Sequence, residues 1–324
     1  MSKPVVIIFG RVTSGVHYHR LIAPFFAMRD KVDVYLFQHL NQNSVPADIL
    51  NKATHIIISR INTFMPIDNI KMFSEVIRSS GRKIIVDVDD WWFFPPDHPN
   101  REDWLKHEHE RRAIKTMTHA DEVWCTSKHL AKKIKRYNKN VHVVPNAVDT
   151  NSMQWNAPKI KSDKVRFGYI GGHYHQKDLE MTGLDLSSYE SYAVDIGGYP
   201  EILNTRYKLG HEPPNRYGLL YSSIDVSLVP LIESEFASCK SNLKLIEAAY
   251  TNTAVIVSDV KPYRNYITEY NCLTPSEVRN WAESVEYFRN NPEAVRWSAA
   301  ELRESMAEFS MDKVNEIRLN RLFL

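Results

Sequence analysis

The sequence predicts an α/β protein with two halves, each containing a parallel sheet flanked by helices. Short runs rich in Val and Ile, such as Val5–Phe9 and Ala254–Val257, are typical of buried parallel strands. Segments with apolar residues at helical spacing, such as residues 16–28, follow several of these runs. The 324 residues are enough for two domains of ordinary size.

The composition excludes several other classes of protein. A hydrophobic fraction of 43% supports packed cores, and a net charge of +2 argues against a general nucleic-acid coat. Cys125, Cys239 and Cys272 are far apart and odd in number, which favours a reducing compartment without disulfides. No cysteine pair or histidine cluster indicates structural zinc. The first residues lack the layout of a signal peptide, so we expect a cytoplasmic protein without an integral membrane segment.

The first half is expected to alternate between strands and helices. Strands are predicted at Val5–Phe9 and at residues 32–37, 55–58, 83–86, 122–125 and 141–144. Helices are predicted at residues 16–28, 70–77, 102–117 and 129–137, with Ser127 as the N-cap of the last one. Residues 132–139 carry five Lys and Arg side chains, which indicates a solvated face or a footprint for nucleic acid or an anionic membrane.

The loop after the first strand contains Gly10 and Gly15, and His17 and Arg20 follow it. A strand, a glycine-containing loop and a helix form the usual start of an α/β ligand-binding fold. The loop is not a Walker loop, because His17 and Tyr18 stand where Lys and Ser or Thr would be needed. Gly15, His17 and Arg20 are therefore candidate contacts for another kind of ligand. A helix-capping turn with exposed histidines is the alternative.

Asp87, Asp89 and Asp90 follow the strand at residues 83–86, where α/β folds place their ligands. Their spacing would also suit a metal ion that holds a diphosphate, because such ions prefer oxygen ligands. We discount a metal because strands and helices alternate on both sides of the motif. We expect Asp89 or Asp90 to contact a substrate, with capping of the next turn as the alternative. Trp91 starts a run of four aromatics, too many for one strand face, which indicates a pocket, an interface or plain packing.

The second half repeats the alternation. Strands are predicted at residues 165–170, 193–196 and 226–228 and at Ala254–Val257. Helices are predicted at residues 217–222, 243–250, 276–288, 294–309 and 311–324. Gly171 and Gly172 end the first of these strands and allow a backbone to approach a ligand closely, and Lys177 stands at the head of a short helix.

The segment at residues 236–263 reads as a loop, a helix, a strand and a turn. Lys240, Ser241 and Lys244 lie at the start of the helix, where free N–H groups and the positive dipole end favour an anion such as phosphate. Glu247 lies one turn further on and is placed to accept hydrogen bonds from a ribose. The alternative is a solvated helix face, with Glu247 as a partner of the helix dipole.

Three segments, at residues 122–149, 165–178 and 236–263, together resemble the GT-B nucleotide-sugar glycosyltransferases of the retaining group 1, or family 4-like, type, which includes bacterial and phage enzymes. The resemblance implies two Rossmann-like, doubly wound domains that face a cleft. Residues 1–155 would form the acceptor-side domain and residues 156–305 the nucleotide-sugar domain. Residues 306–324 would form a final helix, which in this family usually returns to the first domain.

The resemblance implies a glycosyltransferase that moves a hexose or pentose from a nucleotide-diphosphate sugar to a hydroxyl acceptor, with retention of configuration and without a metal or further cofactor. Its implied roles fall into three groups. Catalysis is assigned to Glu235, Asp89 and Asp90; donor binding to Gly171, Gly172, Lys177, Lys240, Ser241, Lys244 and Glu247; and the acceptor side to Gly15, His17, Arg20 and Trp91. The family has a pair of glutamates separated by seven residues, and Cys239 occupies the first position here. Either Glu235 replaces that glutamate or the sugar-facing glutamate is absent.

Other functions remain open at this stage. A nucleotide-sugar epimerase has the same fold, and the glutamate missing at Cys239 makes a non-catalytic binding module conceivable. The acceptor could be a glycan, a lipid-linked sugar or a hydroxymethylated DNA base, as in phage enzymes that act in the host cytoplasm. The sequence does not specify the sugar, the nucleotide, the acceptor, the general base or the oligomeric state.

Overall fold

The computed structural model describes residues 3–38, 45–60, 66–276 and 278–324. The chain divides into two compact units. Unit 1 contains Met1–Asn146, Cys239–Ser241 and Met311–Leu324, and unit 2 contains Ala147–Ser238 and Asn242–Ser310. The sequence places the first boundary at residue 155 and the start of the C-terminal segment at residue 306. In the division into compact units, the first segment of unit 1 ends at Asn146 and its last segment begins at Met311. The domain boundaries themselves stay a prediction.

Unit 1 is built on a parallel sheet that contains six strands within the described residues. These are β1 (Val5–Phe9), β2 (Asp33–Phe37), β3 (His55–Ser59), β4 (Lys83–Val88), β5 (Glu122–Cys125) and β6 (Val141–Val143). Their order is β2-β1-β3-β4-β5-β6. The direction of winding reverses between β1 and β3, and ligands of doubly wound folds bind at such a point, beyond the carboxyl ends of the strands.

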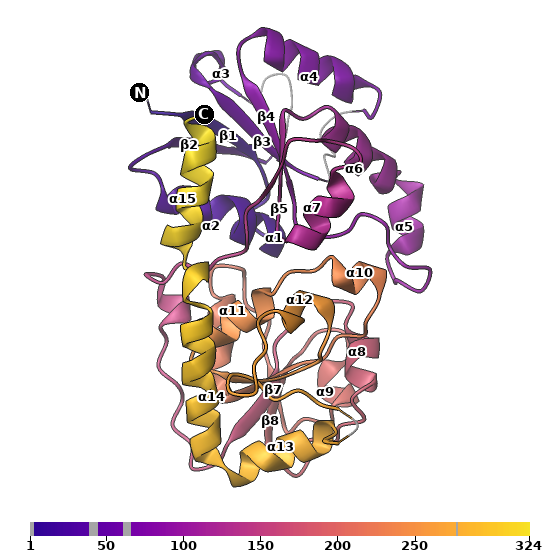
Figure 1. The fold of residues 1–324 in the computed structure, drawn as a ribbon, viewed down its shortest axis with the longest axis vertical. Coiled ribbons are helices and arrows are strands. Elements are labelled where there is room, and N and C mark those ends of the chain that lie inside the picture. The colour runs from indigo at the N-terminus through magenta and orange to yellow at the C-terminus, as the bar shows by residue number, and fades with distance from the viewer. Residues whose placement is uncertain (1–2, 39–44, 61–65, 277) are drawn as a thin grey trace. The chain divides into compact units, whose positions relative to one another are not determined.

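The helices of unit 1 are α1 (Gly15–His17), the π-helix η1 (Tyr18–Ile22), α2 (Ala23–Ala27), α3 (Ala47–Lys52), α4 (Asn69–Ser79), α5 (Arg101–Lys106), α6 (His109–Thr118), α7 (Lys128–Ile134) and α15 (Met311–Leu322). Figure 1 shows α15 beside α2. The single helix predicted at residues 102–117 is two helices, because Glu108 has a positive φ of 52° and interrupts the helical path. Ser127 caps α7, as predicted, by accepting a hydrogen bond from the Leu130 amide.

The π-helix η1 places polar side chains in the core of unit 1. His19, Arg20, Leu21 and Ile22 are four consecutive buried residues. In a regular α-helix, four consecutive side chains point in four directions around the axis, so one buried face does not hold them all. The wider π-turn is often found at functional positions in proteins. It places the guanidinium of Arg20 inside unit 1, where only 2% of the residue is exposed.

Unit 2 contains a second parallel sheet, with five strands in the described part of the chain. These are β7 (Arg166–Tyr169), β8 (Glu190–Val194), β9 (Tyr207–Leu209), β10 (Val226–Val229) and β11 (Ala254–Val257). The order is β11-β10-β7-β8-β9, which reverses its winding between β7 and β10. The short strand β9 is absent from the sequence prediction, and β8 begins three residues earlier than predicted.

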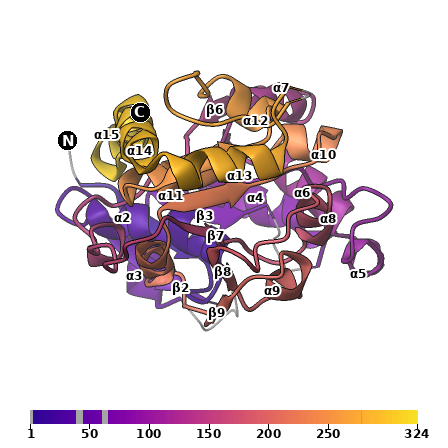
Figure 2. The ribbon, with the colours of Figure 1, turned by 90° about the horizontal axis from the view of Figure 1, so that it is seen from below.

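The helices of unit 2 are η2 (Met153–Trp155), α8 (Gln176–Glu180), α9 (Tyr199–Ile202), η3 (Tyr217–Ser223), α10 (Glu235–Ser238), α11 (Leu243–Tyr250), α12 (Lys261–Arg264), α13 (Trp281–Asn290), α14 (Pro292–Ser305) and η4 (Ala307–Phe309). In Figure 2, α11 lies on one side of the sheet and α9 on the other. The helix predicted from residue 276 begins at Trp281, because Asn280 and Glu283 form a capping box there.

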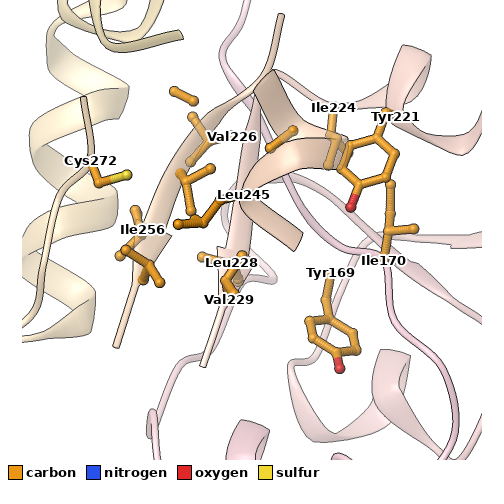
Figure 3. Close-up of a cluster of buried hydrophobic side chains, with 14 of the residues drawn as sticks. Tyr169, Ile170, Tyr221, Ile224, Val226, Leu228, Val229, Leu245, Ile256 and Cys272 are labelled. Carbon is orange, nitrogen blue, oxygen red and sulfur yellow. The ribbon is translucent and has the colours of Figure 1, made fainter. Parts of the chain in front are cut away.

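The core of unit 2 forms where α11 packs against the sheet. Figure 3 shows Leu245 of α11 with Val226 and Leu228 of β10 and with Ile256 of β11. All four side chains are at most 1% exposed. Burial of such aliphatic side chains stabilises a fold by roughly 1.5–3 kcal/mol each. The start of α11 is therefore held on the rigid central part of the sheet.

Candidate functional site

The loop after β7 is held by several hydrogen bonds to neighbouring segments. The Tyr199 hydroxyl donates to the Gly172 carbonyl at 2.6 Å and accepts from the His175 amide at 3.0 Å. Asp178 contacts His175 Nδ1 at 2.7 Å and accepts from the Ile232 amide, which follows β10, at 2.8 Å. These bonds connect the loops that leave β7 and β10, the two strands at the reversal point of unit 2.

Gly171 has a structural reason to be glycine. A Cβ atom at this position would lie 2.3 Å from the Tyr169 hydroxyl, whereas none of the described atoms lies within 4 Å of a Cβ added to Gly172. Tyr174 has a positive φ of 77°, which is rare for an aromatic residue. Lys177 lies in the first turn of α8 with its side chain exposed. The structure therefore places Gly171, Gly172 and Lys177 on one short segment after β7, in which Gly172 and Lys177 are exposed and Gly171 is buried.

Lys244 and Glu247 form the centre of a polar cluster on α11. Lys244 Nζ donates to Glu247 Oε2 and to the Tyr217 hydroxyl, both at 2.8 Å. The Tyr221 hydroxyl donates to the same Glu247 oxygen at 3.0 Å. Glu247 is only 1% exposed. Sequence reasoning missed Tyr217 and Tyr221, whose signal would have been two tyrosines four residues apart on one helical turn.

The cluster holds its charges in place. Burial alone would lower the pKa of Lys244, but the adjacent Glu247 carboxylate raises it above its ordinary value, so the ammonium keeps its proton. Burial and the Glu247 carboxylate raise the pKa of Tyr221 well above its usual range, so this hydroxyl remains a donor. The ion pair is thus preorganised next to Tyr217, whose side chain is partly exposed.

Glu235 lies in the short helix α10 rather than in a loop, and its side chain is exposed. Ser234 caps this helix by accepting from the Ala237 amide at 3.0 Å. Cys239, where the sequence resemblance leads us to expect a glutamate, is fully buried. Burial fits a thiol but would be costly for a carboxylate without a partner.

Lys240 and Ser241 belong to unit 1, although the segments before and after Cys239–Ser241 belong to unit 2. Lys240 Nζ lies 3.6 Å from Asp90 Oδ2. The Asn146 amide donates to the Ser241 hydroxyl at 2.7 Å. The structure thus separates the predicted donor residues into two groups: Lys240 and Ser241 belong to unit 1, while Lys244 and Glu247 contact each other within unit 2.

Arg20 and Asp87 form a buried, two-pronged ion pair in unit 1. Arg20 Nε and Nη2 donate to the two Asp87 oxygens at 2.9 and 2.7 Å. Arg20 Nη1 donates to the Val144 carbonyl at 2.7 Å and to Asn146 Oδ1 at 3.2 Å. Burial would lower the pKa of Arg20, but Asp87 raises it above its usual value. The anion that Arg20 meets in this structure is therefore Asp87.

Asp89 and Asp90 lie against Arg60, a residue that sequence reasoning missed. Arg60 Nε contacts Asp89 Oδ1 at 3.2 Å, and Arg60 Nη1 donates to the carbonyls of Asp90 and Trp91, the latter at 3.1 Å. Burial and the Asp89 carboxylate raise the pKa of Asp90, while Lys240 and Arg60 oppose the rise. The signal for Arg60 was its position directly after β3, at the reversal point of the sheet.

His17 lies near the carboxylates of Asp89 and Asp87. Its Nδ1 accepts from the Arg11 amide at 2.8 Å, so in the neutral ring the proton is on Nε2. Burial lowers the pKa of His17, while Asp89 and Asp87 act in the opposite direction. Gly15 is the first residue of α1, just after Ser14, which caps this helix. His17 therefore presents an N–H donor, and not a lone pair, at Nε2.

Trp91 is packed rather than open, with 8% of the residue exposed. Its ring stacks on Trp92 with centroids 5.1 Å apart, and Lys133 Nζ lies 4.9 Å from its ring centre. Phe94 stacks on Trp104 with centroids 4.2 Å apart. The predicted aromatic run is therefore a layered cluster inside unit 1, with Lys133 placed for a cation–π contact.

The described residues contain no group of three or more His, Cys, Asp and Glu side chains that could hold a metal ion. In the Asp87–Asp89 pair, Arg20 occupies the first carboxylate and Arg60 contacts the second. Among the described helices, none is long and apolar enough to cross a membrane. Cys125, Cys239 and Cys272 are buried, and none of them forms a disulfide within the described part of the chain.

Comparisons with known proteins identify the fold. No protein-family profile matches the chain, and no curated protein matches it by sequence. Solved structures do match. HepE from Anabaena, in complex with UDP, has 11% identity and a TM-score of 0.62, with 99% of this chain and 100% of that chain covered. HepE has also been solved with UDP-glucose.

Two synthases match over similar lengths. Sucrose-phosphate synthase from Thermosynechococcus elongatus has 13% identity and a TM-score of 0.63, with 99% of this chain and 98% of that chain covered. The UDP-forming α,α-trehalose-phosphate synthase from Burkholderia vietnamiensis has 9% identity and a TM-score of 0.60, with 99% and 98% covered. These structures are GT-B glycosyltransferases. With two parallel-sheet α/β units of the Rossmann type, the chain has the GT-B fold, as the sequence resemblance predicts.

Proposed function

We propose that the protein is a glycosyltransferase that uses a nucleotide-diphosphate sugar and transfers the sugar to a hydroxyl acceptor. The observation that supports this most directly is the Lys244–Glu247–Tyr217–Tyr221 cluster at the start of α11, on a fold whose solved examples bind UDP and UDP-glucose. A preorganised ion pair with a partly exposed aromatic ring is suited to a polar, planar ligand such as a nucleotide.

In this proposal, the donor-binding residues expected from the sequence take the following roles. The backbone at Gly171 and Gly172 approaches the diphosphate, because at Gly172 no side chain intervenes. Lys177 and Lys240 neutralise the charge that grows on the leaving diphosphate, which is usually the largest contribution to such a reaction. Glu247 accepts from the ribose hydroxyls, held in position by Lys244 and Tyr221. Glu235, exposed at the start of α10, contacts the sugar.

The transfer breaks the bond between the anomeric carbon and a diphosphate oxygen and forms a bond from the acceptor oxygen to the same carbon. The acceptor hydroxyl loses its proton, and a carboxylate with a raised pKa, such as Asp90, is a suitable proton acceptor. We propose that Asp89 and Asp90 act in catalysis and that Gly15, His17, Arg20 and Trp91 form the acceptor side. His17 would donate from Nε2 to an acceptor oxygen, and Arg20 would act by holding Asp87 in place.

The finer features of the proposal rest on the resemblance. The anomeric configuration is retained, lysine side chains stand in for a metal ion, and the donor sugar is the only cofactor-like molecule needed. The acceptor is a glycan, a lipid-linked sugar or modified DNA. Three cysteines that form no disulfide among the described residues favour the reducing environment of a cytoplasm.

A non-catalytic nucleotide-sugar-binding protein is the second candidate. It is favoured by one observation, the burial of Cys239, where the sequence resemblance leads us to expect a glutamate. Both candidates bind the donor, so turnover is the property that separates them.

A thermal-shift series with UDP-, GDP-, ADP- and CDP-sugars, with and without Mg²⁺, tests the donor site. A ligand at 100 times its Kd adds about 2.7 kcal/mol to the free energy of unfolding. We expect a shift with one nucleotide, a smaller shift in Lys177→Ala, and an unchanged shift in Lys161→Ala, an exposed lysine elsewhere in unit 2. Absence of a shift with every donor would remove the proposal. A shift without sugar transfer or donor hydrolysis would favour the binding protein.

A further inference from the structure

Arg318, on α15, is a fully buried arginine with little hydrogen bonding. The residue is 0% exposed. Its Nη1 donates to Asn315 Oδ1 at 2.9 Å, and Asn315 in turn donates to the Pro24 carbonyl at 3.0 Å. Within the described residues, its Nε and Nη2 atoms are buried and have no hydrogen-bond partner. Nε–H and one Nη2–H lie on the same edge of the guanidinium, the edge that binds a carboxylate with two parallel hydrogen bonds.

The charges around Arg318 do not balance. Asp87 and Arg20 are the groups that act on it electrostatically. Both oxygens of Asp87 already accept from Arg20, at 2.9 and 2.7 Å. Two buried guanidinium groups therefore share one buried carboxylate. A buried charge without a counter-charge is strongly unfavourable.

Deprotonation does not remove this imbalance. Burial and the positive charge of Arg20 lower the pKa of Arg318 to about 9, while Asp87 opposes the shift. Near neutral pH the guanidinium thus stays protonated, as arginine does in proteins generally. Only a further anion would restore neutrality in this part of unit 1.

Arg321 lies three residues further along α15, and the same edge of its guanidinium binds a carboxylate. Its Nε and Nη2 donate to the two oxygens of Glu122 at 3.2 and 2.9 Å. The same edge meets a protein carboxylate in Arg321 and meets none of the described acceptors in Arg318. Arg318 thus has the donor arrangement of a carboxylate-binding arginine without the carboxylate.

We propose that the Nε–Nη2 edge of Arg318 is a binding site for one small monovalent anion, such as chloride or formate. The anion has to be small because Arg318 is fully buried. It would balance the second guanidinium and connect α15 to the Arg20–Asp87 pair at the end of β4. The site does not depend on the proposed transferase activity, because Arg318 is not among the proposed donor or acceptor contacts.

The test compares the thermal stability of the full chain in chloride, bromide and formate with its stability in gluconate, at one ionic strength. Gluconate is too large for a closed site. We expect Tm to rise and to saturate with the small anions only. At an anion concentration 100 times Kd, the folding equilibrium constant should rise about 100-fold. Arg318→Met should abolish the anion response. Lys313→Met, the same change at an exposed position of α15, should keep it.

A direct measurement supports the stability series. Wild-type protein is dialysed from chloride into gluconate and then denatured, and the chloride that it releases is measured. We expect one chloride per chain. A smaller amount is expected only if the Tm series gives a Kd weak enough for chloride to be lost during dialysis. Equal Tm values in all four salts together with no released chloride would overturn the proposal, since the donors would then be satisfied by water. An equal response in Arg318→Met would overturn it as well. If Arg318→Met does not fold, Arg318→Lys keeps the charge but loses the paired edge, and it should show a weaker response.

Discussion

Arg20 and Asp87 are 67 residues apart in the sequence and form two parallel hydrogen bonds of 2.9 and 2.7 Å inside unit 1. Arg20 comes from the π-turn after β1, and Asp87 comes from the end of β4. The pair thus connects two elements at the carboxyl ends of the strands. It also occupies the first carboxylate of a motif that would otherwise be a reasonable metal ligand.

Breaking this pair should be costly. Asp87→Asn and Arg20→Met are each expected to lower the free energy of unfolding by about 3–5 kcal/mol, because each leaves a buried charge without its partner. Urea unfolding measures the change. The double variant should be less destabilised than the sum of the single variants. Two small, additive effects would show that the pair does not hold these elements together.

The Tyr221 hydroxyl should matter for stability and for donor binding. Tyr221→Phe removes a hydrogen bond to a buried carboxylate and is expected to cost about 1.5–3 kcal/mol. Because Glu247 then loses one of its two fixed contacts, the thermal shift with the nucleotide sugar should also decrease. Tyr207→Phe changes a more exposed tyrosine of the same unit in the same way and serves as the control. Equal behaviour of the two variants would contradict the role given to the cluster.

The two glycines after β7 should respond differently to substitution. Gly171→Ala places a methyl group against the Tyr169 ring and is expected to cost about 1–3 kcal/mol. Gly172→Ala meets none of the described atoms within 4 Å, so its stability should stay within about 0.5 kcal/mol of wild type. Thermal unfolding separates the two. If Gly172→Ala reduces the nucleotide-sugar shift while keeping stability, the proposed approach of the diphosphate to this backbone gains support. An unchanged shift would argue against it.

Stability should fall on mild acidification because of His55. Burial and the nearby Lys83 lower the pKa of His55 to about 4, against an ordinary value of 6.5. The unfolded chain therefore binds a proton between these values while the folded chain does not, and stability is lost as pH falls from 6.5 to 4. The expected slope is up to about 1.4 kcal/mol per pH unit. Urea unfolding at pH 7 and pH 5 measures it, and His55→Gln should reduce the slope. An equal slope in this variant would assign the effect to other groups.

Much of the fold could be predicted from local pattern. The strands at Val5–Phe9 and Ala254–Val257 and the Ser127 cap depend on nearby residues, so the sequence predicted them correctly. The strand β9 has only three residues, Tyr207–Leu209, which is too short for an alternating apolar pattern to predict a strand. The break at Glu108 was missed because a charged residue in a charged helix gives no warning of a positive φ.

The candidate site was only partly predictable. Lys244 and Glu247 lie three residues apart on one helix, and helical spacing alone brings such side chains together. Tyr217 and Tyr221 join them through a hydrogen bond across 26 or 27 positions, which no local pattern shows. Lys240 was predicted as a donor contact, whereas the structure places it 3.6 Å from Asp90. Its role as a phosphate contact stays a prediction.

The sequence by itself determined the α/β class, the two halves, and the glycines and carboxylates at the strand ends, because these follow from periodicity and from residue chemistry. Only the tertiary structure decided which charges meet. Arg20 with Asp87 and Arg60 with Asp89 are brought together by the order of the strands in one sheet. Lys240 reaches Asp90 from the segment Cys239–Ser241, which lies far along the chain. The buried and incompletely paired Arg318 is a property of the same kind. A buried charge pairs with a group that the fold brings close in space, whatever the separation of the two residues in the sequence.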